Sequence, residues 1–182
     1  MPIADADIRV ATAEDAALLA DLGARTFRDT FGHANTESDM TSYLADAFGA
    51  DRQAAEIAEP SGVFLIAEVD GATAGYARLR RREAPAGVVG ERPVEIVRFY
   101  ADAPWIGKGI GARLMTASLG LAAEWGCDVV WLDVWEHNPT ALAFYERWGF
   151  SVVGRQGFLL GEDLQNDLLM ARGAVPAQPS AL

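Results

Sequence analysis

The stretch Val94–Gly111, VEIVRFYADAPWIGKGIG, decides the fold of this chain. It opens with apolar and β-branched residues at the spacing of a β-strand, and Ala103-Pro104 ends that pattern. Three alternate glycines, Gly107, Gly109 and Gly111, then precede apolar residues at helical spacing. The stretch therefore predicts a strand, a glycine-rich turn and an amphipathic helix, in that order.

The glycines predict a site for an anion. A glycine lets a ligand approach the backbone closely, because it carries no side chain. The first turn of the helix that follows offers N–H groups without intrahelical acceptors, and it lies at the positive end of the helix dipole. A phosphate or pyrophosphate is the natural ligand of such a turn.

Composition narrows the class of protein. The chain has 182 residues, about half of them hydrophobic, which suits one domain with a sizeable core. The net charge of −11 argues against a nucleic-acid surface. No apolar run is long enough to span a membrane, and the N-terminus lacks the pattern of a signal peptide. A single cysteine, Cys127, excludes an intrachain disulfide, and with only two histidines it argues against a zinc site. We therefore expect a cytoplasmic protein without a metal, a membrane partner or a nucleic-acid partner.

The rest of the chain predicts short elements without an internal repeat. Asp70-Gly71 is a strong hairpin signal, and Asn138-Pro139 combines a helix cap with a favoured first helical residue. Because a helix joins strands Val94–Ala101 and Val129–Trp135, we expect them to be parallel neighbours. We expect one domain over residues 1–173 and a disordered tail over 174–182. Further strands are expected over 8–10, 63–69, 74–82, 151–160 and 168–172, and further helices over 12–31, 36–44 and 51–59.

A second interpretation of the glycines is a dinucleotide fingerprint. Residues 107–112 also fit G-x-G-x-x-(G/A), and Asp133 lies about 20 residues further on, where a ribose-binding acid is expected. However, residues 103–106 separate the strand from the first glycine, which is too late for the tight turn of that fold. Too few residues follow for the remaining βα units. A nicotinamide-dependent oxidoreductase stays a competing hypothesis, which titration with NAD(P)H would test.

Two blocks of the sequence resemble the GNAT superfamily of N-acetyltransferases. The first, WIGKGIG, resembles the family's acetyl-CoA pyrophosphate loop, (Gln/Arg)-x-x-Gly-x-(Gly/Ala), which falls here on Ile106–Gly111. Ile106 stands where Gln or Arg is usual, so a polar side chain is lost while the backbone N–H is kept. The second, WLDVWEHNPTALAFYERWGF, resembles the family's strand–helix block, with Asn138 at the helix start and Tyr145 two turns later. Together with TFRDTFGHANTESDM, this block is most similar to the spermidine/spermine-acetyltransferase-like branch.

The resemblance implies a fold and a cosubstrate. The fold is α+β: a mixed, mainly antiparallel central sheet with helices on both faces, in which the parallel pair splays apart at one end. The cosubstrate is acetyl-CoA, the acyl donor, which enters that gap; a homodimer is frequent in the family. The implied cofactor-binding residues are Phe99, Tyr100, Ala101, Ile106, Gly107, Lys108, Gly109, Ile110, Gly111, Ala112, Asn138 and Tyr145.

The resemblance also implies direct attack of an amine on the acetyl thioester in a ternary complex. A primary alkylamine, with a pKa of about 10.4, arrives protonated, so a base must remove its proton. Strand alternation places Glu95 on one face with Val97 and Phe99, toward the cleft, and makes Glu95 the candidate base. Tyr145 is the candidate acid that protonates the departing thiolate. A backbone N–H of Phe99–Ala101 would stabilise the oxyanion.

The acceptor is expected to be a small-molecule amine. Acidic residues Asp29, Glu37 and Asp39, with the net charge of −11, favour a small cationic amine or a polyamine. A protein N-terminal acetyltransferase is one alternative. A non-catalytic acyl-CoA-binding or sensor module is another, and it predicts binding of acetyl-CoA without turnover.

Overall fold

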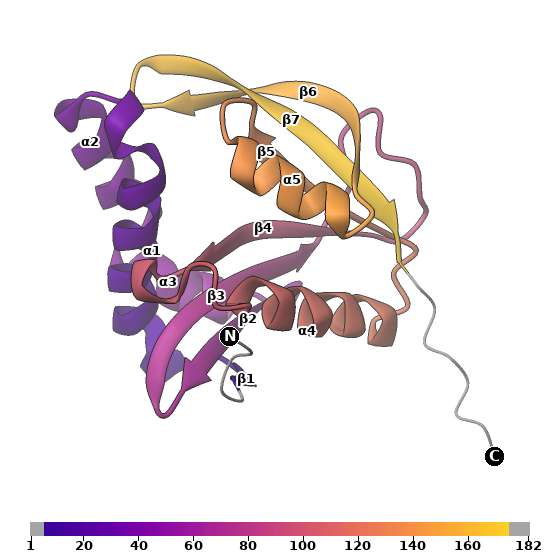
Figure 1. Ribbon diagram of the computed structural model, residues 1–182, viewed down its shortest axis with the longest axis horizontal. Helices are drawn as coiled ribbons and strands as arrows, with labels where there is room; N and C mark the ends of the chain where they lie inside the picture. The colour runs from indigo at the N-terminus through magenta and orange to yellow at the C-terminus, as the bar shows by residue number, and fades with distance from the viewer. Residues whose placement is uncertain (1–5, 175–182) are drawn as a thin grey trace.

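The computed structural model describes residues 6–174, which build one seven-stranded sheet in the order β1-β2-β3-β4-β5-β7-β6 (Figure 1). Apart from Ala174, the tail that we expected to be disordered lies outside the described residues. The strands are β1 (Asp7–Val10), β2 (Gly62–Val69), β3 (Ala72–Arg81), β4 (Pro93–Ala101), β5 (Val129–Trp135), β6 (Ser151–Leu160) and β7 (Asp163–Gly173).

Helices cover both faces of the sheet. Phe64 and Ile66 of β2 pack with residues of α1, whereas the alternate residues Leu65 and Ala67 pack in the core that contains Leu114 of α4. Neighbouring residues of one strand therefore serve two layers, as strand alternation requires. The helices are α1 (Ala16–Phe31), α2 (Glu37–Ala47), α3 (Ala50–Ile57), α4 (Ile110–Glu124) and α5 (Pro139–Arg147).

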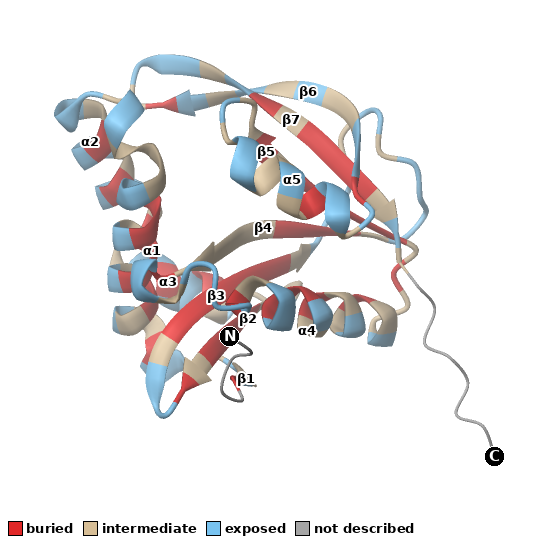
Figure 2. Cartoon of the chain, viewed as in Figure 1, coloured by how far each residue is buried: buried red, intermediate tan, exposed pale blue. Residues whose placement is uncertain are grey.

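Burial follows these layers. Figure 2 shows α1 and α4 with a buried side toward the sheet and an exposed side toward solvent, while β3 and β5 are buried along much of their length. The β2–β3 turn is formed by Asp70 and Gly71, both at positive φ (51° and 79°), as expected of an Asp-Gly hairpin. Within residues 6–174, no helix is long and apolar enough to cross a membrane. The expected fold class is confirmed.

The parallel pair opens as expected. The register of β4 and β5 runs from Pro93 opposite Val129 to Ile96 opposite Leu132 and stops there. Both strands continue, β4 to Ala101 and β5 to Trp135, without pairing to each other. The two strands therefore separate halfway along their length, and the central sheet is open at that point.

A bulge in β4 changes which residues face this opening. Ile96 lies opposite Leu79 and Arg98 opposite Arg78, so Val97 is an extra residue in β4. Beyond the bulge the faces exchange, which places Phe99 toward α5, 5.7 Å between ring centroids from Phe144. The expectation that Glu95 and Phe99 share one face was wrong, because simple alternation does not survive the inserted residue.

Candidate active site

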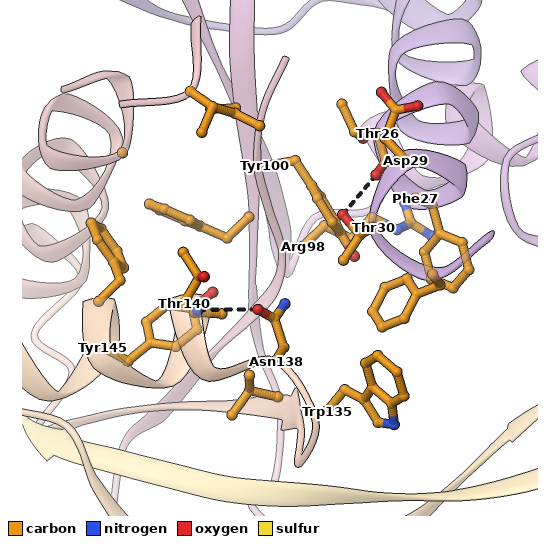
Figure 3. A pocket seen from close by; sticks show the side chains of 18 of the residues that line it. Thr26, Phe27, Asp29, Thr30, Arg98, Tyr100, Trp135, Asn138, Thr140 and Tyr145 are labelled. Carbon is orange, nitrogen blue, oxygen red and sulfur yellow. Dashed lines mark hydrogen bonds between the residues drawn. The ribbon is translucent and has the colours of Figure 1, made fainter. Parts of the chain in front are cut away.

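A slot of about 1100 Å³ passes through the sheet where β4 and β5 separate. Its lining on one side comes from the start of α4 and from α5, and on the other side from α1 and α2. Figure 3 shows Asn138, Thr140 and Tyr145 on the first side and Thr26, Asp29 and Thr30 on the second. Two ligands can therefore approach the same gap from opposite faces of the sheet.

The glycine loop forms the outer end of the α4 side. Gly107 and Gly109 have φ values of 77° and 82°, which a residue with a side chain rarely adopts, and α4 begins at the next residue, Ile110. A side chain at Gly107 would meet no atom within 4 Å, so the space beside this backbone is open. At Gly111, an added Cβ would lie 3.2 Å from the ring of Phe144. The loop thus presents backbone N–H groups at a helix start, an arrangement that suits an anionic group such as a phosphate.

The two side chains that flank this loop in the expected motif have different surroundings. Ile106 has an apolar side chain and is 65% exposed, so the backbone N–H is the polar group that this residue offers to a ligand. Lys108 lies over the ring of Trp105, with Nζ 5.1 Å from the ring centroid. Its charge stays at the edge of the loop, where it favours an anionic ligand.

Helix α5 places Asn138 and Tyr145 on the slot. The Asn138 side-chain oxygen accepts a hydrogen bond from the Ala141 N–H (3.1 Å) and so caps the helix that Pro139 begins. Tyr145 is buried, and its ring meets those of Phe99 and Phe150 edge to face. Burial raises the pKa of the Tyr145 hydroxyl above its ordinary value, so it stays protonated at neutral pH.

Glu95 lies on the wall of the slot, but its carboxylate is already bound. Arg80 donates to Oε2 at 3.1 Å, and Arg82 donates to Oε1 at 3.0 Å and also to Oε2. The Arg82 guanidinium in turn lies over the ring of Trp131, 4.8 Å from its centroid. Both oxygens therefore accept hydrogen bonds from arginine, which weighs against the role of general base that the sequence suggested.

Two further carboxyl groups on the strands line the slot, Asp133 of β5 and Asp167 of β7. Asp133 Oδ2 accepts a hydrogen bond from Gln156, whereas Oδ1 is buried without a partner. Burial, with Asp167 and Glu95 nearby, raises the pKa of Asp133 to about 7. Burial, with Glu136 nearby, raises the pKa of Asp167 to about 6. The sequence carried one signal for this pair: an aspartate inside the apolar strand VVWLDVW.

Aromatic rings line the side of the slot that α1 and α2 form. Phe27 stacks on Tyr43 (4.7 Å between centroids), and Phe31 lies 5.6 Å from Trp135. Figure 3 shows Phe27 and Trp135 around the same opening, with Asp29 of α1 nearby. The walls suit the apolar part of an acceptor, and their π faces also suit a cation.

The three acids expected to attract an acceptor are not equivalent. Asp29 lines the slot. Glu37 accepts from Arg28 at 2.7 Å, and Asp39 accepts from Thr36 and from the Glu162 N–H. Glu37 is thus tied to α1 and Asp39 to the β6–β7 turn, and Asp29 alone of the three lines the slot.

Comparison with known proteins places this site in a family. The model of the acetyltransferase (GNAT) family matches residues 25–150. The chain belongs to the GNAT acetyltransferase family. An uncharacterised N-acetyltransferase of Lactobacillus delbrueckii subsp. lactis is 36% identical over 150 residues, which cover 82% of this chain and 87% of that protein. The aminoglycoside N(6')-acetyltransferase type 1 of Stenotrophomonas maltophilia is 30% identical over 149 residues, 81% of this chain and 88% of that enzyme. This GNAT protein is an acyltransferase.

Solved structures agree on the fold. The PaiA N-acetyltransferase of Thermoplasma acidophilum, solved in complex with coenzyme A, superposes with a TM-score of 0.75 at 20% identity, covering 93% of this chain and 99% of that one. The expected family is confirmed by the family model and by the relative from Lactobacillus, and the superposition agrees with them on the fold. Support for the polyamine branch is weaker, because the spermine/spermidine N(1)-acetyltransferase of Bacillus subtilis is 34% identical over only 62 residues, 34% of this chain and 41% of that enzyme.

Proposed function

We propose that this GNAT protein transfers an acetyl group from acetyl-CoA to a primary amine of a small molecule, with a small cationic amine or a polyamine favoured. The single observation that carries the proposal is the slot through the sheet, which joins a glycine cradle for an anion to an acidic, aromatic chamber. One domain over residues 1–173 would perform the whole reaction in a ternary complex.

The donor side would hold acetyl-CoA by its backbone. Gly107 to Ala112 would bind the pyrophosphate at the start of α4, with the Lys108 charge at its edge. Asn138 would contact the pantetheine arm while it caps α5. Acetyl-CoA supplies the activated acyl group, a thioester carbonyl.

Strand β4 supplies the polar backbone of the reaction centre. Beyond Ile96, the edge of β4 that faces β5 has no strand partner among the described residues. An N–H of Phe99–Ala101 would therefore stabilise the negative charge that develops on the carbonyl oxygen. The Tyr145 hydroxyl, protonated at neutral pH, would give its proton to the departing sulfur.

The acceptor side supports an amine that is cationic in solution. The slot carries Asp29, Asp133 and Asp167 among aromatic walls. Among the relatives, one enzyme is named for aminoglycosides and another for spermine and spermidine, both of which carry amino groups. These names favour a basic acceptor without deciding between the two kinds.

The test is an assay that follows free CoA with acetyl-CoA and a panel of amines: polyamines, aminoglycosides, arylalkylamines, amino acids and N-terminal peptides. We expect release of CoA with a basic small molecule. Acetyl-CoA binding without turnover over the panel would instead indicate a sensor module, and turnover with peptides alone would indicate an N-terminal acetyltransferase. Binding of NAD(P)H without binding of acetyl-CoA would overturn the proposal. Light scattering would test the homodimer that the family resemblance favours.

A further inference from the structure

We propose that Asp133 and Asp167 form the seat of the reacting amine, and that Asp133 takes its proton. The inference rests on the proposed acetyltransferase function and names the general base of that site. It assigns Glu95 a different task, that of a positioning residue bound between two arginines.

The strand register places the two carboxyl groups together. In the β5–β7 ladder, Trp135 lies opposite Asp167 and Asp133 lies opposite Leu169. Asp133 and Asp167 are therefore diagonal neighbours on one face of the sheet, where side chains on adjacent strands come within reach of each other. Asp133 also follows directly after the last β4–β5 pair, Ile96 opposite Leu132, so it lies where the gap between the strands begins.

Both carboxyl groups keep an oxygen free for a ligand. Asp133 Oδ1 and Asp167 Oδ1 are buried and accept no hydrogen bond, although both residues line the slot. The Asp167 residue is only 8% exposed. A buried carboxylate oxygen without a donor is costly, and an ammonium group, which carries only donors, would satisfy it. The Glu95 oxygens, bound by Arg80 and Arg82, offer no such vacancy.

The charges that face Asp133 come from each element around it. Asp167 on β7 and Glu95 on β4 disfavour its ionised form, whereas Arg82 after β3 favours it, and Gln156 on β6 donates a hydrogen bond. The negative charge of Glu136, which follows β5, contributes to raising the pKa of Asp167. The charge of Asp167 in turn contributes to raising the pKa of Tyr43 of α2. Because Arg82 is held by Glu95, no arginine hydrogen bond neutralises Asp133. The seat thus retains acidic character that a cationic amine can neutralise.

The proton balance of the transfer is simple. A protonated amine first releases one proton to solvent through the carboxyl pair. The nitrogen lone pair of the neutral amine then forms the N–C bond to the thioester carbonyl, and its surplus proton passes to the Asp133 carboxylate. The C–S bond breaks with its electron pair on sulfur, which takes the Tyr145 proton. Asp133 afterwards loses its proton to solvent, and the tyrosinate regains one. From a protonated amine and acetyl-CoA, the products are therefore one N-acetylated amine, one CoA thiol and one proton.

The experiment compares Asp133→Asn and Asp167→Asn with Glu124→Gln, a change of equal charge at an exposed residue of α4 away from the slot. The best amine of the panel serves for all variants, so its own ionisation is common to every profile. We expect Asp133→Asn to lower kcat by about 10²-fold or more and to remove the acidic limb of the kcat–pH profile. Asp167→Asn should move that limb to lower pH, because it removes the negative neighbour that raises the pKa of Asp133.

Each outcome has one meaning. The inference is overturned if the wild type turns over an amine while the kcat of Asp133→Asn stays within about twofold of it and the acidic limb of the profile does not move. The proposed function would then remain intact. Absence of wild-type turnover on any amine would count against the proposed function. Isothermal titration of wild type and of Asp133→Asn with a polyamine of the panel would then decide the seat alone. Unchanged amine affinity in that titration would overturn it. Should Asp133→Asn fail to fold, the limb shift of Asp167→Asn decides, and an unmoved limb overturns the inference.

Discussion

Arg82 donates hydrogen bonds to both oxygens of Glu95, and Arg80 donates a further bond to one of them. This contact ties the segment after β3 to β4 immediately before the strand opens toward the slot. Glu95 is 5% exposed, so its charge is tolerable only with these donors. The interaction fixes a wall of the site and leaves no carboxylate oxygen for a substrate proton.

Glu95→Gln is expected to lower stability more than catalysis. The amide still accepts one arginine hydrogen bond, but the charge that balances the two guanidinium groups is lost. Because Arg82 is 43% exposed at its side chain, we expect a loss of about 1 kcal/mol in the free energy of unfolding. Urea denaturation measures this, and kcat should stay within about fivefold of wild type. A loss of 10²-fold in kcat with unchanged stability would return Glu95 to the role of general base.

Tyr145→Phe is expected to lower kcat by about 10²-fold with little change in acetyl-CoA affinity. The ring keeps its edge-to-face contacts with Phe99 and Phe150, and the variant removes only the hydroxyl proton donor. Steady-state assays give kcat, and calorimetry gives the affinity for acetyl-CoA. If kcat stays within about twofold, Tyr145 is a core residue and water protonates the thiolate.

The glycine loop can be tested with a matched pair, Gly107→Asp and Gly107→Asn. Both side chains tolerate positive φ better than most, and the space beside Gly107 is open. The pair therefore differs in charge and little else. We expect Gly107→Asp to weaken acetyl-CoA binding at least about tenfold more than Gly107→Asn, because its carboxylate repels the pyrophosphate. Equal affinities by calorimetry would mean that the phosphates bind elsewhere.

Much of the fold was predictable from local signals. The structure keeps three local preferences of the sequence: the Asp-Gly turn at 70–71, the Asn138 cap and the largely apolar strand Val129–Trp135. The loop at Gly107–Gly111 was predictable for the same reason, since positive φ and close backbone approach require glycine.

The chemistry of the slot was less predictable, because it depends on register. The bulge at Val97 exchanges the faces of β4, and no residue type announces such an insertion. The arginines that bind Glu95 come from the neighbouring strand β3 and from the segment after it, and Asp167 joins Asp133 only through the β5–β7 ladder. These are non-local pairings, and the periodicity of one strand contains no information about its neighbour.

The last prediction concerns attraction of the acceptor and uses Asp29→Asn beside Glu37→Gln. Both changes remove one negative charge from the same region, but only Asp29 lines the slot, while Glu37 is paired with Arg28. The net charge of −11 attracts any cation, and this attraction is screened over about 8 Å at physiological salt. An acid within the slot acts at shorter range on the bound amine. We therefore expect kcat/KM for a cationic acceptor to fall as salt rises, and Asp29→Asn to weaken this dependence and raise KM severalfold, whereas Glu37→Gln leaves both nearly unchanged. Equal effects of the two variants would assign the attraction to net charge alone, and a salt-independent kcat/KM would show that the acceptor is not selected by its charge.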